Sequence, residues 1–188
     1  MTAAKFYESL IAAAFFAFAY FLTFLVQINV LKDFDFLPMA SILFIPAGIK
    51  FVALLVGGGA GVVGLTIGWI FVEQHLGSEF ELGTALSHTF VWLLLPYICM
   101  TGYLKKYHLK SNLENLTAYH VLVLAMILSF VSSLGTQLLF VGLPDINYPL
   151  LKGIWSMSLG DFSGILVSLG LVLVVRRVIA RSRSRAAD

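Results

Sequence analysis

The stretch that decides the fold is FIPAGIKFVALLVGGGAGVVG, which runs from Phe44 to Gly64. It is almost entirely apolar, it is rich in glycine, and it carries one lysine, Lys50, near its middle. Lysine is almost never fully buried in a protein unless it has a partner. The stretch therefore poses two questions: which solvent surrounds it, and which group accompanies the lysine.

The composition of the whole chain answers the first question. Hydrophobic residues make up 60% of the 188 residues and charged residues only 12%, whereas soluble domains are about half apolar and about a quarter charged. Too little charge is present to cover a water-exposed surface, so we expect an integral membrane protein. The first apolar run lacks a small-residue cleavage site, and Glu8 closely follows Lys5, which favours a retained span over a signal peptide.

Apolar runs of about 20 residues are long enough to cross a bilayer as helices. They predict an all-α, polytopic membrane helix bundle of about six transmembrane helices, near residues 9–30, 38–56, 59–73, 84–103, 117–141 and 154–175. Residues 1–175 form a single transmembrane bundle in this prediction, and residues 176–188 form a basic cytoplasmic tail. Because only GGGAG separates the second run from the third, residues 38–73 are either two full spans or include a re-entrant segment.

Positive charges predict the orientation of the bundle. Six spans would put nine of the twelve basic residues on the side of both termini, among them Lys5, Lys105, Lys106 and the five arginines after Val175. Basic residues favour the cytoplasmic side, so we expect a multi-pass protein of the bacterial inner membrane with both termini cytoplasmic. An odd number of spans would place the N-terminus outside. The basic tail suits anionic lipid headgroups, and we expect no nucleic-acid partner.

Lys50 would be a cation inside an apolar span, which costs at least about 2.5–3.5 kcal/mol on insertion scales. Its candidate partner is Asp161 in SMSLGDFSGILV. Both residues lie on spans that run inward, and their depths differ by only about 7–8 Å at a rise of about 1.5 Å per residue. Two interpretations stay open. Either Lys50 snorkels to the headgroups and Asp161 caps a helix, or the two share a buried polar site, which could be purely structural.

Other polar residues could join such a site. Gln137 and His88 fall in the outer halves of their spans, and Trp155 and Asn147 lie near the outer mouth. With Asp161 they could line a pocket that opens to the outside and accepts a small-molecule ligand. The alternative is that each packs a helix or anchors it at the interface. An aromatic belt suits three aromatic residues in particular: Trp69, Tyr148 and Trp155.

Small residues predict close helix packing. Gly57, Gly61, Gly64 and Gly68 recur at spacings of four, three and four, which places them on one face of a helix. A helix-packing role is also expected for Gly48, Gly160 and Gly164. Pro46 lacks a backbone donor and clashes with the preceding turn, so we expect it to bend or break its helix. The region from Pro46 to Lys50 should then be irregular and buried within protein.

No catalytic set stands out in the sequence. There is no HExxH and no Gly-x-Ser-x-Gly motif. The four histidines show no metal-ligand spacing, and the single cysteine, Cys99, excludes a disulfide within the chain. We therefore expect no enzymatic activity, no cofactor and no bound metal.

Three segments are similar to parts of a known family. FIPAGIKFVALLVGGGAGVVGLTIG (44–68) resembles the early part of the first membrane-associated sensor domain family. LKSNLENLTAYHVLVLAMILSFVSSLGT (109–136) looks like its middle portion, and WSMSLGDFSGILV (155–167) resembles its closing helix. The likeness spans roughly residues 38–175. The residues that match the family's motifs are Pro46, Ala47, Gly48, Gly57, Gly64, Gly68, Asp161 and Gly164.

The resemblance implies an integral sensory module that usually precedes a diguanylate cyclase or a histidine kinase. The chain departs from that pattern in two ways. It is shorter than the family's eight-helix domain, and no output domain follows Arg176. A sensor of this kind would have to act through a protein partner in the membrane or at its cytoplasmic face.

Three functions remain in competition. The first is a non-enzymatic sensory or regulatory membrane protein that binds a small ligand or a partner on the outer side and signals through its last helix. The second is a substrate-binding subunit of a small-molecule uptake transporter, which would dock its partner through Ala13, Ala17 and the glycine face of the third span. The third is a structural accessory subunit of a larger membrane complex. A co-purifying ATPase pair would select the second function, and a stoichiometric complex partner the third.

Overall fold

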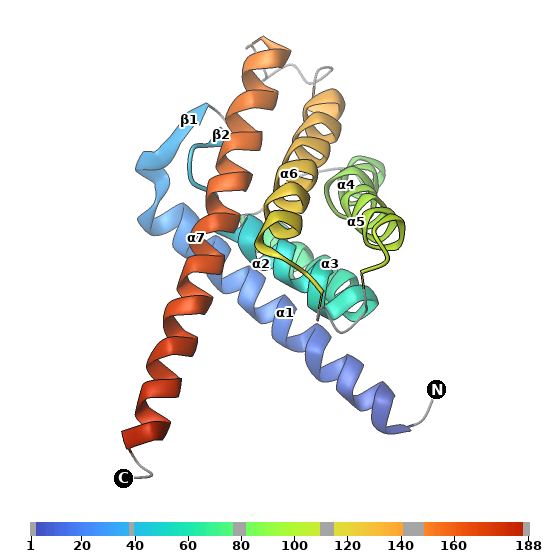
Figure 1. Cartoon of the computed structure of the whole chain (residues 1–188). Coiled ribbons are helices and arrows are strands. Elements are labelled where there is room, and N and C mark those ends of the chain that lie inside the picture. Colours follow the sequence, from blue (N-terminus) through green and yellow to red (C-terminus); the bar gives the residue numbers. More distant parts are fainter. Residues whose placement is uncertain (1–2, 38–39, 77–81, 110–114, 141–148, 186–188) are drawn as a thin grey trace.

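The computed structural model describes residues 3–37, 40–76, 82–109, 115–140 and 149–185. Apart from one short strand pair, its regular structure is helical (Figure 1). The helices are α1 (Ala3–Val30), α2 (Pro46–Val52), α3 (Gly58–Leu76), α4 (Leu82–Thr89), α5 (Leu95–Lys106), α6 (Ala118–Phe140) and α7 (Leu150–Arg185). The short elements are a 3₁₀ turn η1 (Lys32–Phe34), the antiparallel strands β1 (Asp35–Leu37) and β2 (Ala40–Ser41), and two π-helical turns, η2 (Ala53–Gly57) and η3 (Phe90–Leu94).

Four helical segments in the described part of the chain are long and apolar enough to cross a membrane. They are Ala3–Val30, Pro46–Leu76, Ala118–Leu139 and Leu150–Val174. The structure thus shows a helical fold compatible with a membrane protein. It does not confirm the expected count of about six, because α4, η3 and α5 are not among these segments and Pro46–Leu76 counts once.

The α1 and α3 helices run side by side in the same direction, held together by small residues. A Cβ added to Gly64 would collide with the Ala13 carbonyl oxygen, and one added to Gly68 would lie within 2.7 Å of the Ala17 carbonyl oxygen. Because the two contacts advance together along both helices, the helices are parallel. Glycine lets the two backbones touch, as in other closely packed membrane helices.

The chain reverses direction within Pro46–Leu76, at the turn between η2 and α3. Gly58 has φ +51° and ψ −126°, a conformation that only glycine adopts without strain. Across this turn, a Cβ on Gly61 would collide with the carbonyl oxygen of Ala53. In an uninterrupted helix these two residues would be about 12 Å apart. The segment is therefore a helical hairpin, with α2 and η2 as its first arm and α3 as its second.

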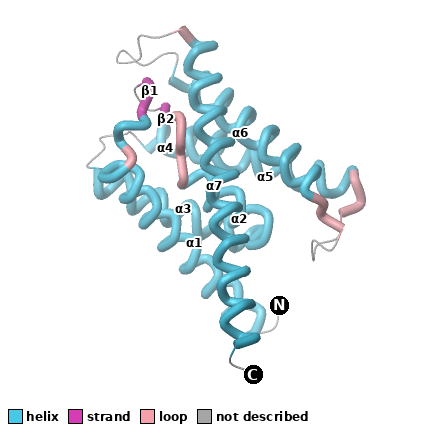
Figure 2. Tube along the Cα trace, turned by 60° about the vertical axis from the view of Figure 1, so that its left-hand side comes forward, coloured by secondary structure: helices cyan, strands magenta, loops and turns pink. Residues whose placement is uncertain are grey.

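The expected helix over residues 38–56 is wrong in its first half. Residues 38–39 lie outside the described residues, and Ser41–Ile45 form a largely extended segment that leads from the strand pair to α2 (Figure 2). Only its last residue, Ile45, already has helical φ and ψ, at −57° and −37°. Pro46 does not bend a helix, as the sequence suggested, but starts one, because it occupies the first position of α2. A proline fits there since the missing N–H has no helical partner at that position.

The extended segment runs along α7 at two glycines. A Cβ at Gly160 would collide with the carbonyl oxygen of Ser41, and a Cβ at Gly164 with that of Phe44. The backbone N–H of Phe44 donates to the carbonyl of Gly160 at 3.1 Å. Gly160 and Gly164 therefore do serve close packing, but their neighbour is extended backbone rather than a second helix.

The helices of the second half of the chain run antiparallel to one another and pack against α1, α2 and α3. The helical run from α4 through η3 to α5 lies beside α6, and α6 lies beside α7 (Figure 1). The buried centre lies where these helices meet α1, α2 and α3, and its most deeply buried apolar side chains include Phe51, Leu54, Leu65, Leu93, Leu124, Leu128 and Ile165.

Candidate functional site

A buried ion pair lies at the centre of the bundle. The Nζ atom of Lys50 on α2 lies 3.2 Å from Oδ2 of Asp161 on α7, and both side chains are 2% exposed. Of the two interpretations that the sequence left open, the structure therefore shows the shared buried site. Lys50 does not snorkel to a surface, and Asp161 does not cap a helix, because it lies in the interior of α7.

Lys50 has two further partners. Its ammonium group donates to Oγ of Ser132 on α6 at 2.8 Å, and it lies 4.9 Å from the centre of the Trp92 ring in η3. The hydroxyl of Ser132 is within 3.4 Å of the Trp92 carbonyl oxygen, to which it donates. Four elements far apart in the sequence thus converge on one ammonium group, and its donors meet a carboxylate, a hydroxyl and an aromatic face.

The position of Lys50 depends on the irregular segment that precedes it. The side chain of Gln27 on α1 accepts a hydrogen bond from the backbone N–H of Ile45 at 3.2 Å and donates to the hydroxyl of Ser41 at 3.3 Å. Below these contacts, Gly48 lies directly against Ser168 of α7. Because the extended segment is fixed at both ends, α2 begins in the interior and carries Lys50 to the level of Asp161.

An aromatic cluster forms one wall of the site. The ring of Trp92 lies 5.3 Å from that of Tyr20 and 6.2 Å from that of His88, measured between ring centres. The His88 ring also lies 5.4 Å from the Trp69 ring. His88 is therefore part of the wall that supports Trp92, and Trp69 is buried in the same cluster rather than in an aromatic belt.

A polar face of α6 forms the opposite wall. Ser129, Ser132, Ser133, Thr136 and Gln137 are all at most 2% exposed, and their spacing of three and four residues puts them on one side of the helix. Within the described residues, the hydroxyls of Ser129, Ser133 and Thr136 have no hydrogen-bond partner, and neither has that of Ser158 on α7. Leaving a buried polar group unpaired typically costs about 1–3 kcal/mol.

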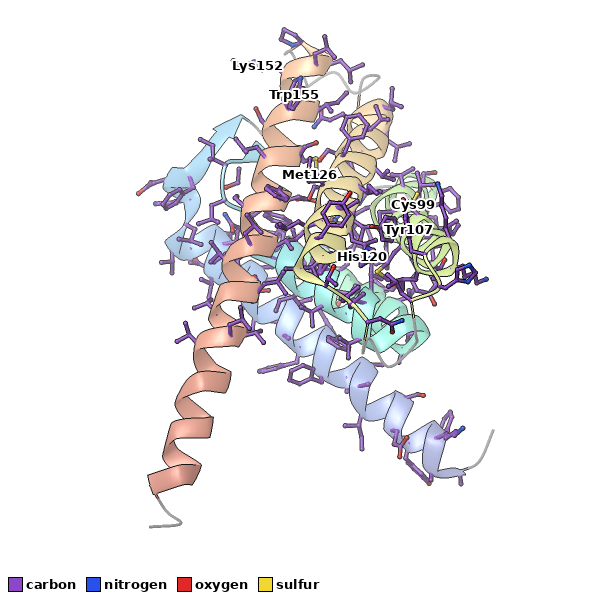
Figure 3. The ribbon with its side chains drawn as sticks, viewed as in Figure 1. Cys99, Tyr107, His120, Met126, Lys152 and Trp155 are labelled. Atoms are coloured by element: carbon purple, nitrogen blue, oxygen red, sulfur yellow. The ribbon has the colours of Figure 1, made fainter. Side chains whose placement is uncertain are left out.

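Gln137 and Trp155, the other residues expected at the site, have different fates. Gln137 is buried on α6, with 1% of its surface exposed, and its side-chain amide contacts the sulfur of Met157 at 3.9 Å. Trp155 is 72% exposed and lies with Lys152 near the beginning of α7, so it does not reach the pair (Figure 3). Asn147 and Tyr148 lie outside the described residues.

The expected glycine face is divided between two neighbours. Gly57 belongs to η2, ahead of the chain reversal, and meets the ring of Phe16 on α1. Gly61 faces Ala53 across the turn, whereas Gly64 and Gly68 of α3 face the backbone of α1. The prediction that all four share one helix face was wrong for Gly57, because the turn at Gly58 separates it from α3.

Sequence reasoning missed Ser132, Trp92 and Gln27. Ser132 could have been found from the spacing of small polar residues in an otherwise apolar helix, since these recur three and four residues apart. Trp92 and Gln27 gave no comparable signal, because each is a single residue in an apolar run whose direction depends on tertiary packing.

The arrangement can hold one positive and one negative charge in a buried, hydroxyl-rich interior. Taken together the pair carries no net charge, and it joins α2 to α7 directly. In the described part of the chain no group of three or more His, Cys, Asp or Glu side chains could hold a metal ion. The geometry is that of a buried ion pair within a polar cluster.

Comparisons with known proteins give no relative for this chain. No family model matches it, and neither a curated protein nor a solved structure does.

Proposed function

We propose that the protein is a non-enzymatic sensory or regulatory protein of the bacterial inner membrane. It crosses the membrane six times, with both termini in the cytoplasm, and binds a small ligand or a protein partner. We call residues 41–57, the extended segment together with the first arm of the hairpin, the broken segment. Binding on the outer side alters the contact between this broken segment and α7, and α7 passes the change to a partner at its basic cytoplasmic end.

The Lys50–Asp161 contact carries this proposal. It is the polar link between α2, which is anchored by an extended segment, and the long helix α7, which ends in the arginine-rich tail. A ligand group that competes for Lys50 or Asp161 would bind better to a state in which the link is open. Such differential affinity is the only way in which a ligand can shift the position of a helix.

The chain reversal at Gly58 supports six crossings. The contacts of the extended segment with α7 advance from Gly160 at Ser41 to Gly164 at Phe44, a rise of about 6 Å, and the helical residues 46–57 add about 18 Å at about 1.5 Å per residue. The sum of about 24 Å approaches the hydrocarbon thickness of about 30 Å. The broken segment and α3 then count as two crossings, and the run from α4 to α5 supplies another.

The likeness to the first membrane-associated sensor domain family supports the same proposal. Pro46, Ala47 and Gly48, which match one of its motifs, begin the helix that carries Lys50. Asp161, which matches another, is the partner of that lysine. The matching residues therefore lie on both sides of one contact, where a transmitted signal would have to pass.

The two alternative functions gain no comparable support. The small-residue faces that would dock a transporter partner are occupied within the chain, because Ala13 and Ala17 contact Gly64 and Gly68. An accessory subunit does not need a buried ion pair with unpaired hydroxyls beside it.

Native mass spectrometry of the protein purified in mild detergent tests the proposal. We expect a bound small molecule or partner on the wild type and its loss on Lys50→Met. The matched control is Lys152→Met, which removes an exposed lysine from the beginning of α7 (Figure 3) and should leave binding unchanged. A wild type that carries no bound species, or a bound species that survives Lys50→Met, contradicts the proposal.

A further inference from the structure

The unpaired hydroxyls beside the ion pair are unlike the other hydroxyls of the fold. Thr23, Thr66 and Thr101 each donate to a backbone carbonyl three or four residues earlier in their own helix. In the described residues, Ser133 and Thr136 make no such bond, although they are wholly buried. A helical hydroxyl can bond to a carbonyl of its own helix, so two buried hydroxyls without that bond are left with unused hydrogen-bonding capacity.

Their place in the bundle gives them a common direction. On the antiparallel helices α6 and α7, Ser132 meets the Lys50–Asp161 pair, and Gln137 meets Met157. Ser133 and Thr136 lie between these two levels, and the rise from Ser132 to the end of α6 at Phe140 is about 12 Å. The hydroxyls therefore lead from the end of the bundle where α6 stops and α7 starts down to the ion pair.

We propose that this hydroxyl face, made of Ser133 and Thr136 on α6 with Ser158 on α7, binds small uncharged molecules that donate and accept hydrogen bonds. Water occupies it in the resting protein, and a hydroxyl-bearing solute is the ligand class it selects. The Lys50–Asp161 pair is its inner end. The inference rests on the proposed function, because it names the chemistry of the ligand at that site.

The chemistry of the lining determines the class. Hydroxyl groups both donate and accept hydrogen bonds, so they suit partners that do the same. The ion pair contributes no net charge, so an ionic ligand would lose its hydration without meeting an opposite charge. A buried water needs two to four polar partners, and the unpaired hydroxyls of α6 and α7 are free to act as such partners.

Cysteine labelling tests the inference in the full-length protein reconstituted into lipid vesicles. The only native cysteine, Cys99 (Figure 3), is first replaced by alanine, and the Cys99→Ala protein is the background for all further variants. Ser133→Cys and Thr136→Cys are then treated with 2-hydroxyethyl methanethiosulfonate, a small uncharged hydroxyl-bearing reagent. Only the hydrated thiolate reacts, so we expect labelling at least about tenfold faster than at control positions.

Two control positions share the same helix. Leu138→Cys lies beside Thr136 but is exposed on the apolar outer surface, and Leu128→Cys is buried among apolar side chains. Ser129→Cys lies on the far side of the pair and should react as slowly as these controls. Equal rates at Ser133, Thr136 and the controls overturn the binding face, and fast labelling of Ser129→Cys overturns the ion pair as its inner end.

Circular dichroism and gel filtration of each variant show whether it is folded. Ser→Cys changes only one atom, so we expect the serine variants to fold. A variant that does not fold is replaced by Ser158→Cys on the facing helix. The outcome is separate from that of the proposed function. Fast labelling with no ligand or partner in native mass spectrometry removes the sensory role and leaves the hydrated face. A bound species in native mass spectrometry, combined with slow labelling, removes the hydrated face and leaves the sensory role.

Discussion

Lys50 is held inside an apolar bundle by partners of three kinds. Asp161 supplies the opposite charge, Ser132 a neutral acceptor, and Trp92 an aromatic face. A buried pair of this kind is weak evidence for stability, because desolvation of two charges opposes their attraction. Removing only one of the two charged side chains is destabilising, because the other charge then stays buried without a partner.

Removing either partner alone should therefore be worse than removing both. We expect Lys50→Met and Asp161→Asn each to lower the free energy of unfolding by about 3–5 kcal/mol. The double variant Lys50→Met/Asp161→Asn should be more stable than either single variant, because no charge remains unpaired. The free energies come from unfolding in mixed micelles with increasing sodium dodecyl sulfate, followed by helical circular dichroism.

A double-mutant cycle gives the energy of the contact itself. The control is Lys152→Met combined with Asp161→Asn, since Lys152 lies outside the core. Losses that simply add in the Lys50/Asp161 cycle would remove the case for a contact between the two side chains.

The sequence predicted the two charges of the site but not their neighbours. A lysine and an aspartate in apolar spans are rare enough to identify each other. Serine and tryptophan are common in membrane helices, so Ser132 and Trp92 acquire their roles only when α6 and η3 are packed against α2. Trp155 shows the converse error, because an aromatic residue near a polar one is equally able to point outward.

At the scale of elements, the extended segment Ser41–Ile45 depends on distant partners. Its backbone groups are bonded to Gln27 on α1 and to Gly160 and Ser163 on α7. Irregular backbone is tolerated at membrane depth only where protein satisfies it in this way. Because none of these partners is close in sequence, local patterns predicted a helical span near 38–56 that bends or breaks at Pro46. The error fell at the residues before Pro46, where tertiary contacts replace helical hydrogen bonds.

Gly164→Ala should displace this segment. The new Cβ would meet the carbonyl oxygen of Phe44, and overpacking of a fitted interior typically costs about 1–3 kcal/mol. Gly170→Ala, on the same helix with no atom within 4 Å of the new Cβ, should be neutral or stabilise by up to about 1 kcal/mol. Thermal denaturation in detergent compares the two, and equal midpoints would mean that the segment does not touch α7.

The turn between η2 and α3 gives a second matched pair. Gly58→Ala should destabilise the hairpin by about 1–3 kcal/mol, because its φ of +51° and ψ of −126° form a backbone conformation that only glycine adopts without strain. Gly59→Ala has open space around its Cβ and should be harmless. The same denaturation assay applies, and a Gly58→Ala protein as stable as Gly59→Ala would argue for a straight helix through Gly58.

At the scale of the whole molecule, both ends of the chain lie on one side. The start of α1 and the end of α7 extend past the packed centre in the same direction in both views (Figures 1 and 2). The apolar residues Leu171, Val172, Leu173 and Val174 are all more than half exposed, so nothing in the described chain covers this part of α7. A bilayer would supply the missing surroundings.

Reporter fusions test the six-pass topology. Green fluorescent protein fused to either terminus should fluoresce, because it folds in the cytoplasm. Alkaline phosphatase inserted after Lys152 should be active, since that position lies at the opposite end of α7 from the tail. If the fluorescent protein is bright when fused to the N-terminus but dark when fused to the C-terminus, the two ends lie on opposite faces of the membrane.

The bundle and the broken segment differ in how far the sequence predicts them. Helical class and the presence of long apolar segments follow from composition, because these depend on the solvent and on chain length alone. The hairpin at Gly58 and the extended backbone before Pro46 depend on close backbone contacts. Sequence showed where such contacts were possible, as glycines, but not which glycine faced which neighbour.

Two wide turns flank the ion pair: η2 begins three residues after Lys50, and η3 contains Trp92. A π-helical turn amounts to one residue inserted into an α-helix. Deleting a single residue from either turn would restore ordinary helical phase and swing everything beyond it by about 100°. The lineage of this fold could therefore exchange one set of inward-facing side chains for another through a one-codon change, without dismantling either helix.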